Sequence, residues 1–317
     1  MGPDPFSSRH TQVYHRVQEN QRAVEQMGRI RGTGVFASAM VALLLGWGSS
    51  ANAAESKTAI TSATGPEVRS AMALVVDAEN GDVLFERDAT LVAPIASITK
   101  LMTALVVLDG QQPLDQVIVI TTDDKWTGKG AFSHLPVGAK LTRADLLRLA
   151  LMASENRAAR TLARTYPGGM PEFVRTMNLK AKVLGMTQTR FDDPSGLSSN
   201  NVSSARDLAK LINAASRDPM IREFSTLPSY DVRVGKNMLS FRNTNLLIGK
   251  PDWNIVVQKT GFTNDAGECL VMETTIGERS VVMVLLNSFG KLTRTADARR
   301  IRRWMEARAV PTLASQN

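Results

Sequence analysis

Residues 94–103 read Pro-Ile-Ala-Ser-Ile-Thr-Lys-Leu-Met-Thr, and this stretch decides how the rest of the chain is interpreted. Apolar residues recur at helical spacing after the proline, so a helix is predicted over 97–108. Ser97 and Lys100 stand three residues apart, which brings their side chains onto one face of that helix. A serine hydroxyl needs a base to become a nucleophile, and a lysine amine serves only when desolvation or a second cation lowers its pKa. The stretch therefore predicts a nucleophilic serine activated by a lysine.

A second polar motif, Ser154-Glu155-Asn156, lies between predicted helices over 142–152 and 156–165. Serine and asparagine are favoured helix caps. Taken alone, this motif indicates only a boundary between two packed helices.

A third motif, Lys259-Thr260-Gly261, ends an apolar run and is predicted to lie on a strand edge that faces a cleft. A lysine at a strand end is usually only solvated. Beside the first motif, however, Lys259 could be the second cation that lowers the pKa of Lys100, and Lys259 with Thr260 could bind a carboxylate. Gly261 has no side chain, which would let a substrate peptide lie against the strand.

The order of the predicted elements indicates an α/β fold of the α+β type. Strands open the chain on either side of an Asn-Gly turn, helices follow, and strands return before a last helix over 294–308. The outer segments must pair with each other. We therefore expect an antiparallel sheet flanked by terminal helices, with an all-α lobe over about 97–215 inserted and the functional cleft between sheet and lobe.

Residues 1–53 are predicted to be a leader that contains a signal peptide. Two arginines precede its apolar segment over 35–47, and an Ala-Asn-Ala cleavage sequence stands just before residue 54. The apolar segment is short for a bilayer span, so an uncleaved anchor is the alternative. The mature domain would then span 54–317 in the periplasm, with translation starting at Met1 or Met27.

Composition narrows the classes of site that the chain can hold. The net charge of +8 becomes +6 without the leader, which favours anionic surroundings, and no nucleic-acid motif is present. Cys269 is the only cysteine, so an intramolecular disulfide is impossible. His134 is the only histidine beyond the leader, which excludes a histidine-rich metal site. We expect neither a metal nor another cofactor.

Together the three motifs resemble those of the penicillin-binding protein and serine β-lactamase superfamily. The likeness to low-molecular-mass D-alanyl-D-alanine peptidases also includes Asp-Pro-Ser-Gly-Leu at 193–197 and the residues from Lys259 to Gly267. The resemblance implies the β-lactamase/transpeptidase-like fold and an acyl-enzyme intermediate. It implies Ser97 as nucleophile, Lys100 as general base and Ser154 as proton relay. It further implies that Asn156 helps the reaction by holding the substrate backbone, and that substrate also binds at Lys259, Thr260 and Gly261. The N–H groups of Ser97 and Phe262 would form the oxyanion hole.

Within that family the chain most resembles the D-alanyl-D-alanine endopeptidase group, the penicillin-binding protein 7 type. Glu155 is typical of that group, whereas carboxypeptidases usually carry glycine there and class A β-lactamases carry aspartate. The chain also ends soon after its last predicted helix, whereas carboxypeptidases commonly continue into a second domain. The implied substrates are peptidoglycan stem peptides joined through D-Ala–diaminopimelate cross-links, and β-lactam antibiotics are implied ligands.

Three alternatives stay open at this point: a D-alanyl-D-alanine carboxypeptidase, a serine β-lactamase and a non-enzymatic wall-binding protein. The basic helix over 294–308 also leaves two readings. Its Ile301 and Trp304 could pack onto the sheet, or the helix could touch a membrane surface.

Overall fold

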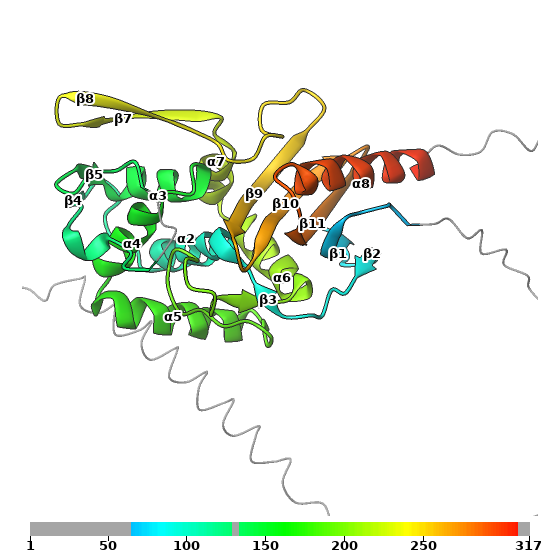
Figure 1. Cartoon of the computed structure of the whole chain (residues 1–317), viewed down its shortest axis with the longest axis horizontal. Coiled ribbons are helices and arrows are strands. Elements are labelled where there is room, and N and C mark those ends of the chain that lie inside the picture. Colours follow the sequence, from blue (N-terminus) through cyan, green and yellow to red (C-terminus); the bar gives the residue numbers. More distant parts are fainter. Residues whose placement is uncertain (1–64, 129–132, 310–317) are drawn as a thin grey trace, which may run out of the picture. The chain divides into compact units, whose positions relative to one another are not determined.

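The structure is a computed structural model that describes residues 65–128 and 133–309. The predicted leader lies outside the described residues. Five strands form one antiparallel sheet in the order β2-β1-β11-β10-β9, so that β9 is an edge strand (Figure 1). The strands are β1 (Ser70–Asp77), β2 (Val83–Arg87), β9 (Asn254–Thr263), β10 (Gly267–Ile276) and β11 (Arg279–Ser288).

The first and last strands of the sheet pair with each other, as the order of elements predicted. Ser70 lies opposite Ser288, and the register continues to Asp77 opposite Val281. The central strands are apolar on both faces, since alternate residues of β1 belong to two separate core clusters. Burial on both faces explains why these strands appear in the sequence as continuous apolar runs.

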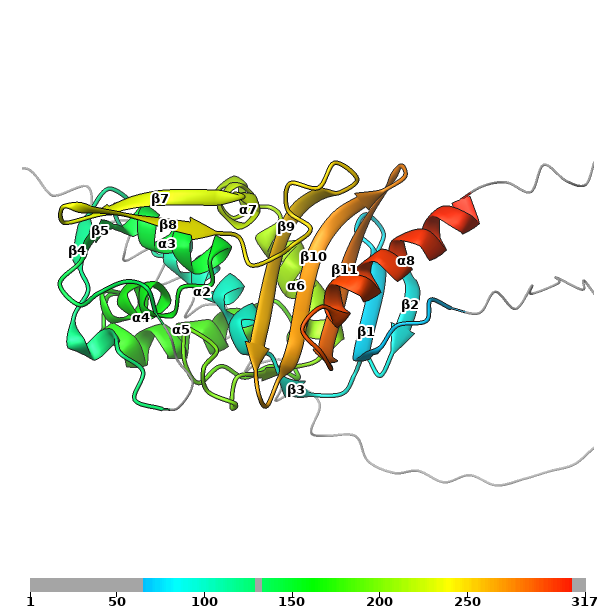
Figure 2. The same ribbon diagram turned by 45° about the horizontal axis from the view of Figure 1, so that its top comes forward.

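Helices cover both faces of this sheet (Figure 2). On one face lies α8 (Thr293–Ala309), whose Ile301 is fully buried and whose Trp304 ring meets the Phe85 ring edge-on at 6.2 Å between centroids. The other face is covered by α6 (Ala205–Ala215), which contacts β1, β10 and β11. We expected this helix in the inserted lobe, but its apolar residues pack against both α2 and the sheet.

The helical segment carries the elements that hold the first two motifs. Its helices are η2 (Ala96–Thr99), α2 (Lys100–Asp109), η3 (Thr122–Asp124), α3 (Arg143–Met152), α4 (Asn156–Arg164), α5 (Gly169–Val183) and α7 (Pro219–Thr226). The helix predicted from Ser97 therefore begins as a 3-10 turn and becomes α-helical at Lys100.

In the described residues three small two-stranded sheets accompany the helices, and only one of them lies wholly within the lobe predicted over 97–215. They pair β3 (Ala93–Pro94) with β6 (Val202–Ser203), β4 (Val117–Val119) with β5 (Lys140–Thr142), and β7 (Ser229–Val234) with β8 (Asn237–Arg242). The sequence of β7 alternates between polar and apolar residues, and Tyr230, Val232 and Val234 are less exposed than the residues between them. This pattern of a half-buried strand is a signal that the sequence-based prediction of elements did not use.

Two basic residues of α8 form ion pairs within the helix. Arg300 pairs with Asp297 at 2.6 Å, and Arg302 pairs with Glu306 at 2.7 Å. Within residues 65–128 and 133–309, no helix combines the length and the apolar character needed to cross a bilayer. The apolar residues of α8 face the sheet, which accounts for them without a membrane contact.

Candidate active site

Lys100 is the centre of the hydrogen-bond network at the first motif. Its Nζ donates to Ser97 Oγ at 2.8 Å, to Asn156 Oδ1 at 2.8 Å and to the carbonyl oxygen of Ser195 at 2.6 Å. Three acceptors match the three N–H bonds of an ammonium group. Lys100 is fully buried, whereas Ser97 is partly exposed. The amine is therefore held in one orientation, next to a hydroxyl that a ligand can reach.

Burial sets the proton affinity of this amine. Desolvation lowers the pKa of Lys100 to about 7, against the negative charges of Asp193 and Glu155, which raise it. The pKa of Lys259, also fully buried, is held well below its usual value by desolvation and then by the positive charge of Lys100. The sequence left desolvation and a second cation as alternative causes of a low Lys100 pKa, and desolvation by burial is the cause that lowers it.

The Asp-Pro-Ser-Gly loop over 193–196 provides the Ser195 carbonyl oxygen that accepts a hydrogen bond from Lys100. Asp193 Oδ1 accepts from the Ser195 N–H at 2.6 Å, the Ser195 hydroxyl at 2.5 Å and the Gly196 N–H at 3.0 Å, and its Oδ2 accepts from the Ser198 N–H at 2.7 Å. Both carboxylate oxygens are therefore occupied. The carboxylate fixes the loop whose carbonyl oxygen binds Lys100.

Two glycines let other segments approach the nucleophile closely. A Cβ at Gly196, which has φ +80°, would lie 1.9 Å from the carbonyl oxygen of Ala96. A Cβ at Gly261 would lie 2.9 Å from the carbonyl oxygen of Ile95 and 3.2 Å from the Ser97 nitrogen. Gly261 is thus required by the protein's own backbone. The sequence suggested room for a substrate peptide instead.

Replacing Gly196 by alanine should therefore disrupt the site. We expect a loss of folding free energy on the order of 3 kcal/mol or more together with much slower acylation, because the added Cβ must displace the Ala96–Ser97 backbone. Gly185→Ala is the matched control, since Gly185 has φ +69° and nothing within 4 Å. It should cost only about 1 kcal/mol. Equal losses for both variants, measured by urea unfolding, would show that the close approach is unimportant.

The third motif lies on the edge strand β9. Lys259 and Thr260 are buried, and the Thr260 and Thr244 hydroxyls are 2.5 Å apart. Phe262, by contrast, is 58% exposed. Lys259 Nζ donates to the carbonyl oxygen of Thr260 at 2.9 Å. The motif thus combines two buried polar side chains with an exposed aromatic residue at the end of the strand.

Sequence reasoning missed Arg294 as a neighbour of this motif. Its guanidinium donates to the carbonyl oxygen of Gly261 at 2.6 Å and pairs with Glu268 at 2.6 Å. Its positive charge also contributes to the low pKa of Lys259. Arg294 stands near the start of a basic helix, where nothing in the local pattern separates it from solvated arginines.

The second motif occupies the turn between α3 and α4. Ser154 has φ +59°, an uncommon backbone conformation for serine, and is half-buried. Glu155 is buried, accepts a hydrogen bond from the Ser133 hydroxyl, and has its pKa raised by burial. Asn156 bonds Lys100 directly. In the described part of the chain, no hydrogen bond joins the Ser154 hydroxyl to Ser97 or Lys100.

The site therefore brings together residues from segments that are far apart in the chain. Lys100 contacts both Ser97 and Asn156 directly. Gly261 lies against the Ser97 backbone, and the positive charge of Lys100 helps to lower the pKa of Lys259. Chemically, the arrangement can deprotonate a serine hydroxyl beside two buried amines. A serine acyl-transfer enzyme with a lysine base requires these groups.

Comparison with known proteins identifies a peptidase family for this chain. The profile of a peptidase family described as D-alanyl-D-alanine carboxypeptidase matches residues 58–290. A protein of Pseudomonas aeruginosa named D-alanyl-D-alanine endopeptidase is 51% identical over 249 residues, or 78% of this chain and 80% of that protein. The protein of the same name in Escherichia coli is 46% identical over 269 residues, or 84% of this chain and 86% of its own length.

Solved structures show the same fold. The DD-transpeptidase of a Streptomyces strain matches with a TM-score of 0.71 and 27% identity, covering 77% of this chain and 99% of that structure. A D-alanyl-D-alanine carboxypeptidase of Mycobacterium tuberculosis matches with a TM-score of 0.70 and 29% identity, covering 80% and 96%. The predicted β-lactamase/transpeptidase-like fold is thereby confirmed, and the chain belongs to the D-alanyl-D-alanine carboxypeptidase family of serine peptidases, as a serine DD-peptidase.

Proposed function

We propose that this DD-peptidase is an endopeptidase that cleaves D-Ala–diaminopimelate cross-links in peptidoglycan. The observation that carries the chemistry is the 2.8 Å contact between Lys100 Nζ and Ser97 Oγ, in a buried setting that lowers the lysine pKa to about 7. The choice of cross-links is supported by the two relatives named D-alanyl-D-alanine endopeptidase, at 51% and 46% identity.

In the proposed mechanism, neutral Lys100 takes the proton of Ser97 while Ser97 Oγ attacks the carbonyl carbon of a D-alanyl peptide bond. The N–H groups of Ser97 and Phe262 stabilise the oxyanion. Ser154 passes a proton to the leaving amine, and Asn156 holds the peptide backbone. Water then hydrolyses the ester and regenerates Ser97.

Lys259 and Thr260 are proposed to bind the carboxylate next to the leaving amine. A cross-link through diaminopimelate carries a free carboxylate at that position, and so does a terminal D-Ala. The same residues therefore serve endopeptidase and carboxypeptidase substrates, so the carboxypeptidase remains the second candidate. We expect β-lactam antibiotics to acylate the same serine.

A β-lactamase function is less well supported, because rapid hydrolysis of the acyl-enzyme needs a base for the attacking water. Two buried carboxylates raise the pKa of Lys100, those of Asp193 and Glu155. Both oxygens of Asp193 accept hydrogen bonds from the 195–198 backbone or the Ser195 hydroxyl, and Glu155 accepts one from the Ser133 hydroxyl. Both carboxylates therefore hold neighbouring segments in place.

The product ratio tests the choice of substrate. Purified mature protein incubated with intact peptidoglycan should release uncross-linked muropeptides and remove little D-alanine from pentapeptides, as measured by mass spectrometry of the products. Ser97→Ala protein is the control for contaminating hydrolases. Free D-alanine with intact cross-links would identify a carboxypeptidase instead.

We also propose that the protein acts in the periplasm after removal of the leader over 1–53. The support is the arginine-flanked apolar segment over 35–47 and the cleavage sequence before residue 54. N-terminal sequencing of protein released by osmotic shock should find a start near Ala54. A start that retains the apolar segment would mean membrane anchorage.

A further inference from the structure

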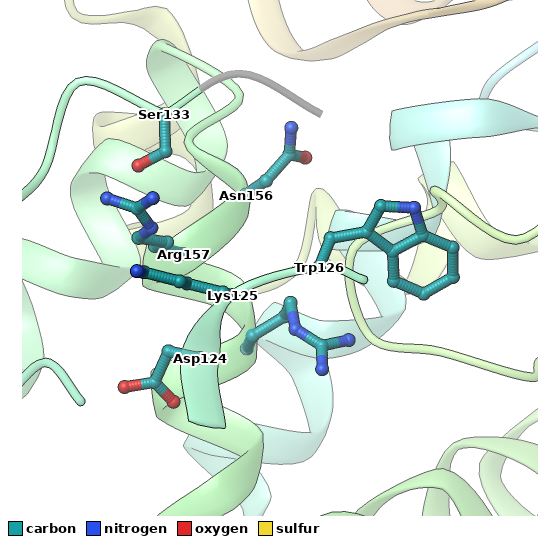
Figure 3. A pocket seen from close by; sticks show the side chains of 7 residues that line it. Asp124, Lys125, Trp126, Ser133, Asn156 and Arg157 are labelled. Carbon is teal, nitrogen blue, oxygen red and sulfur yellow. The ribbon is translucent and has the colours of Figure 1, made fainter. Parts of the chain in front are cut away.

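A pocket of about 90 Å³ adjoins the catalytic residues at Asn156 (Figure 3). We name it the basic pocket; its walls include Lys125, Trp126, Ser133, Asn156, Arg157 and Arg160. Asn156 is shared, because its Oδ1 also accepts the hydrogen bond from Lys100. A peptide held at Asn156 during reaction at Ser97 therefore lies next to this pocket.

The basic pocket carries an excess of positive charge. Asp124 also lines it, but this carboxylate is fully buried and bidentate with Arg164, at 2.7 Å and 3.0 Å. Within the described part of the chain, no ion pair engages Lys125, Arg157 or Arg160. The nearby Glu155 carboxylate accepts a hydrogen bond from the Ser133 hydroxyl, and its negative charge raises the pKa of Lys100. Three cations thus share the pocket without a matching acid.

Arg160 also has an unused hydrogen-bond donor. Its Nε is buried and has no acceptor among the described residues, while its guanidinium lies 5.5 Å from the centre of the Trp126 ring. Arg157 is fixed beside it, because its Nη1 donates to the carbonyl oxygen of Leu135. The Nε itself has almost no accessible surface, so an oxygen anion bound in the pocket would instead meet the rest of the Arg160 guanidinium and offset its positive charge.

We propose that the basic pocket binds a free carboxylate of the acyl-donor peptide, the strand that becomes attached to Ser97. This inference rests on the proposed function and assigns a further subsite to it. Guanidinium groups bind carboxylates through paired, charge-assisted hydrogen bonds. A single water molecule needs a cavity volume of about 10–15 Å³, so a pocket of about 90 Å³ has room for a carboxylate group.

The test compares donor peptides that differ only in charge. Cross-linked muropeptides are prepared with the donor-strand carboxylates free or amidated one at a time, and kcat/KM is measured for wild type, Arg160→Gln and Lys125→Gln. Wild type should prefer the free carboxylate at one position by about tenfold, and Arg160→Gln should lose that preference through a higher KM. Lys125 is exposed, so its variant tests the pocket without disturbing the core.

Controls separate this proposal from misfolding and from failure of the proposed function. Acylation by a small penicillin should be unchanged in both variants, and Arg206→Gln, an exposed arginine outside the pocket, should behave as wild type. The donor preference is measurable whether the leaving group is diaminopimelate or D-alanine. Equal rates for free and amidated donors in wild type, or equal losses on both donors in the variants, would overturn the carboxylate subsite.

Discussion

Ser97→Ala protein should form no covalent adduct with a labelled penicillin and should cleave peptide substrates roughly 10⁴-fold or more slowly than wild type. The reason is covalent: without Oγ there is no atom to form the ester. Folding free energy should fall by only about 1–3 kcal/mol, because the variant removes the hydrogen bond that Ser97 Oγ accepts from buried Lys100 at 2.8 Å and a long one of 3.5 Å to the carbonyl oxygen of Ser195. Intact-protein mass spectrometry and thermal unfolding check both expectations.

The wild-type adduct should also persist, since Asp193 is not available to activate water. Ser216→Ala is a control outside the site and should label normally. An adduct mapped to another residue would remove Ser97 from its role. Rapid recovery of free enzyme would favour the β-lactamase alternative.

Replacing Lys100 by methionine should slow acylation by about 10²- to 10⁴-fold, the usual contribution of a general base, while initial binding of penicillin changes little. Methionine keeps most of the buried aliphatic volume. It removes the Nζ hydrogen bonds to Asn156 Oδ1 and to the carbonyl oxygen of Ser195, which should cost about 0.5–1.5 kcal/mol of folding free energy for each bond. Stopped-flow acylation kinetics separate the two effects, and a near-normal acylation rate in a folded variant would refute the assignment.

The pH dependence of wild-type acylation provides an independent test. Only neutral Lys100 can accept the Ser97 proton, so the rate should rise with pH and reach half its maximum near pH 7, where the pKa of Lys100 lies. Glu155→Gln removes a negative charge that raises this pKa. The midpoint should therefore move to lower pH in that variant. A shift to higher pH would mean that Glu155 does not act on Lys100 through its charge.

Local sequence patterns were sufficient for much of the fold and for the three motifs that hold the candidate site residues. Helical spacing places Ser97 and Lys100 on one face, and apolar runs mark the paired strands at both ends of the chain, because these features depend on neighbouring residues. The alternating residues of β7 carried a strand signal that was missed, whereas the placement of α6 on the sheet was not predictable in this way. That placement depends on which surfaces remain to be covered once the sheet has formed.

Only the tertiary structure decides the chemistry of Lys100. Its low pKa follows from complete burial, and two of its three acceptors come from Asn156 and Ser195, which are 56 and 95 residues away in the chain. Gly196 and Arg294 also reach the site from distant segments of the chain. Sequence spacing records local geometry, whereas desolvation and long-range hydrogen bonds arise only when the chain has folded. The motifs therefore indicate which groups are candidates for the reaction, and the fold sets the pKa of Lys100 on which the proposed reaction depends.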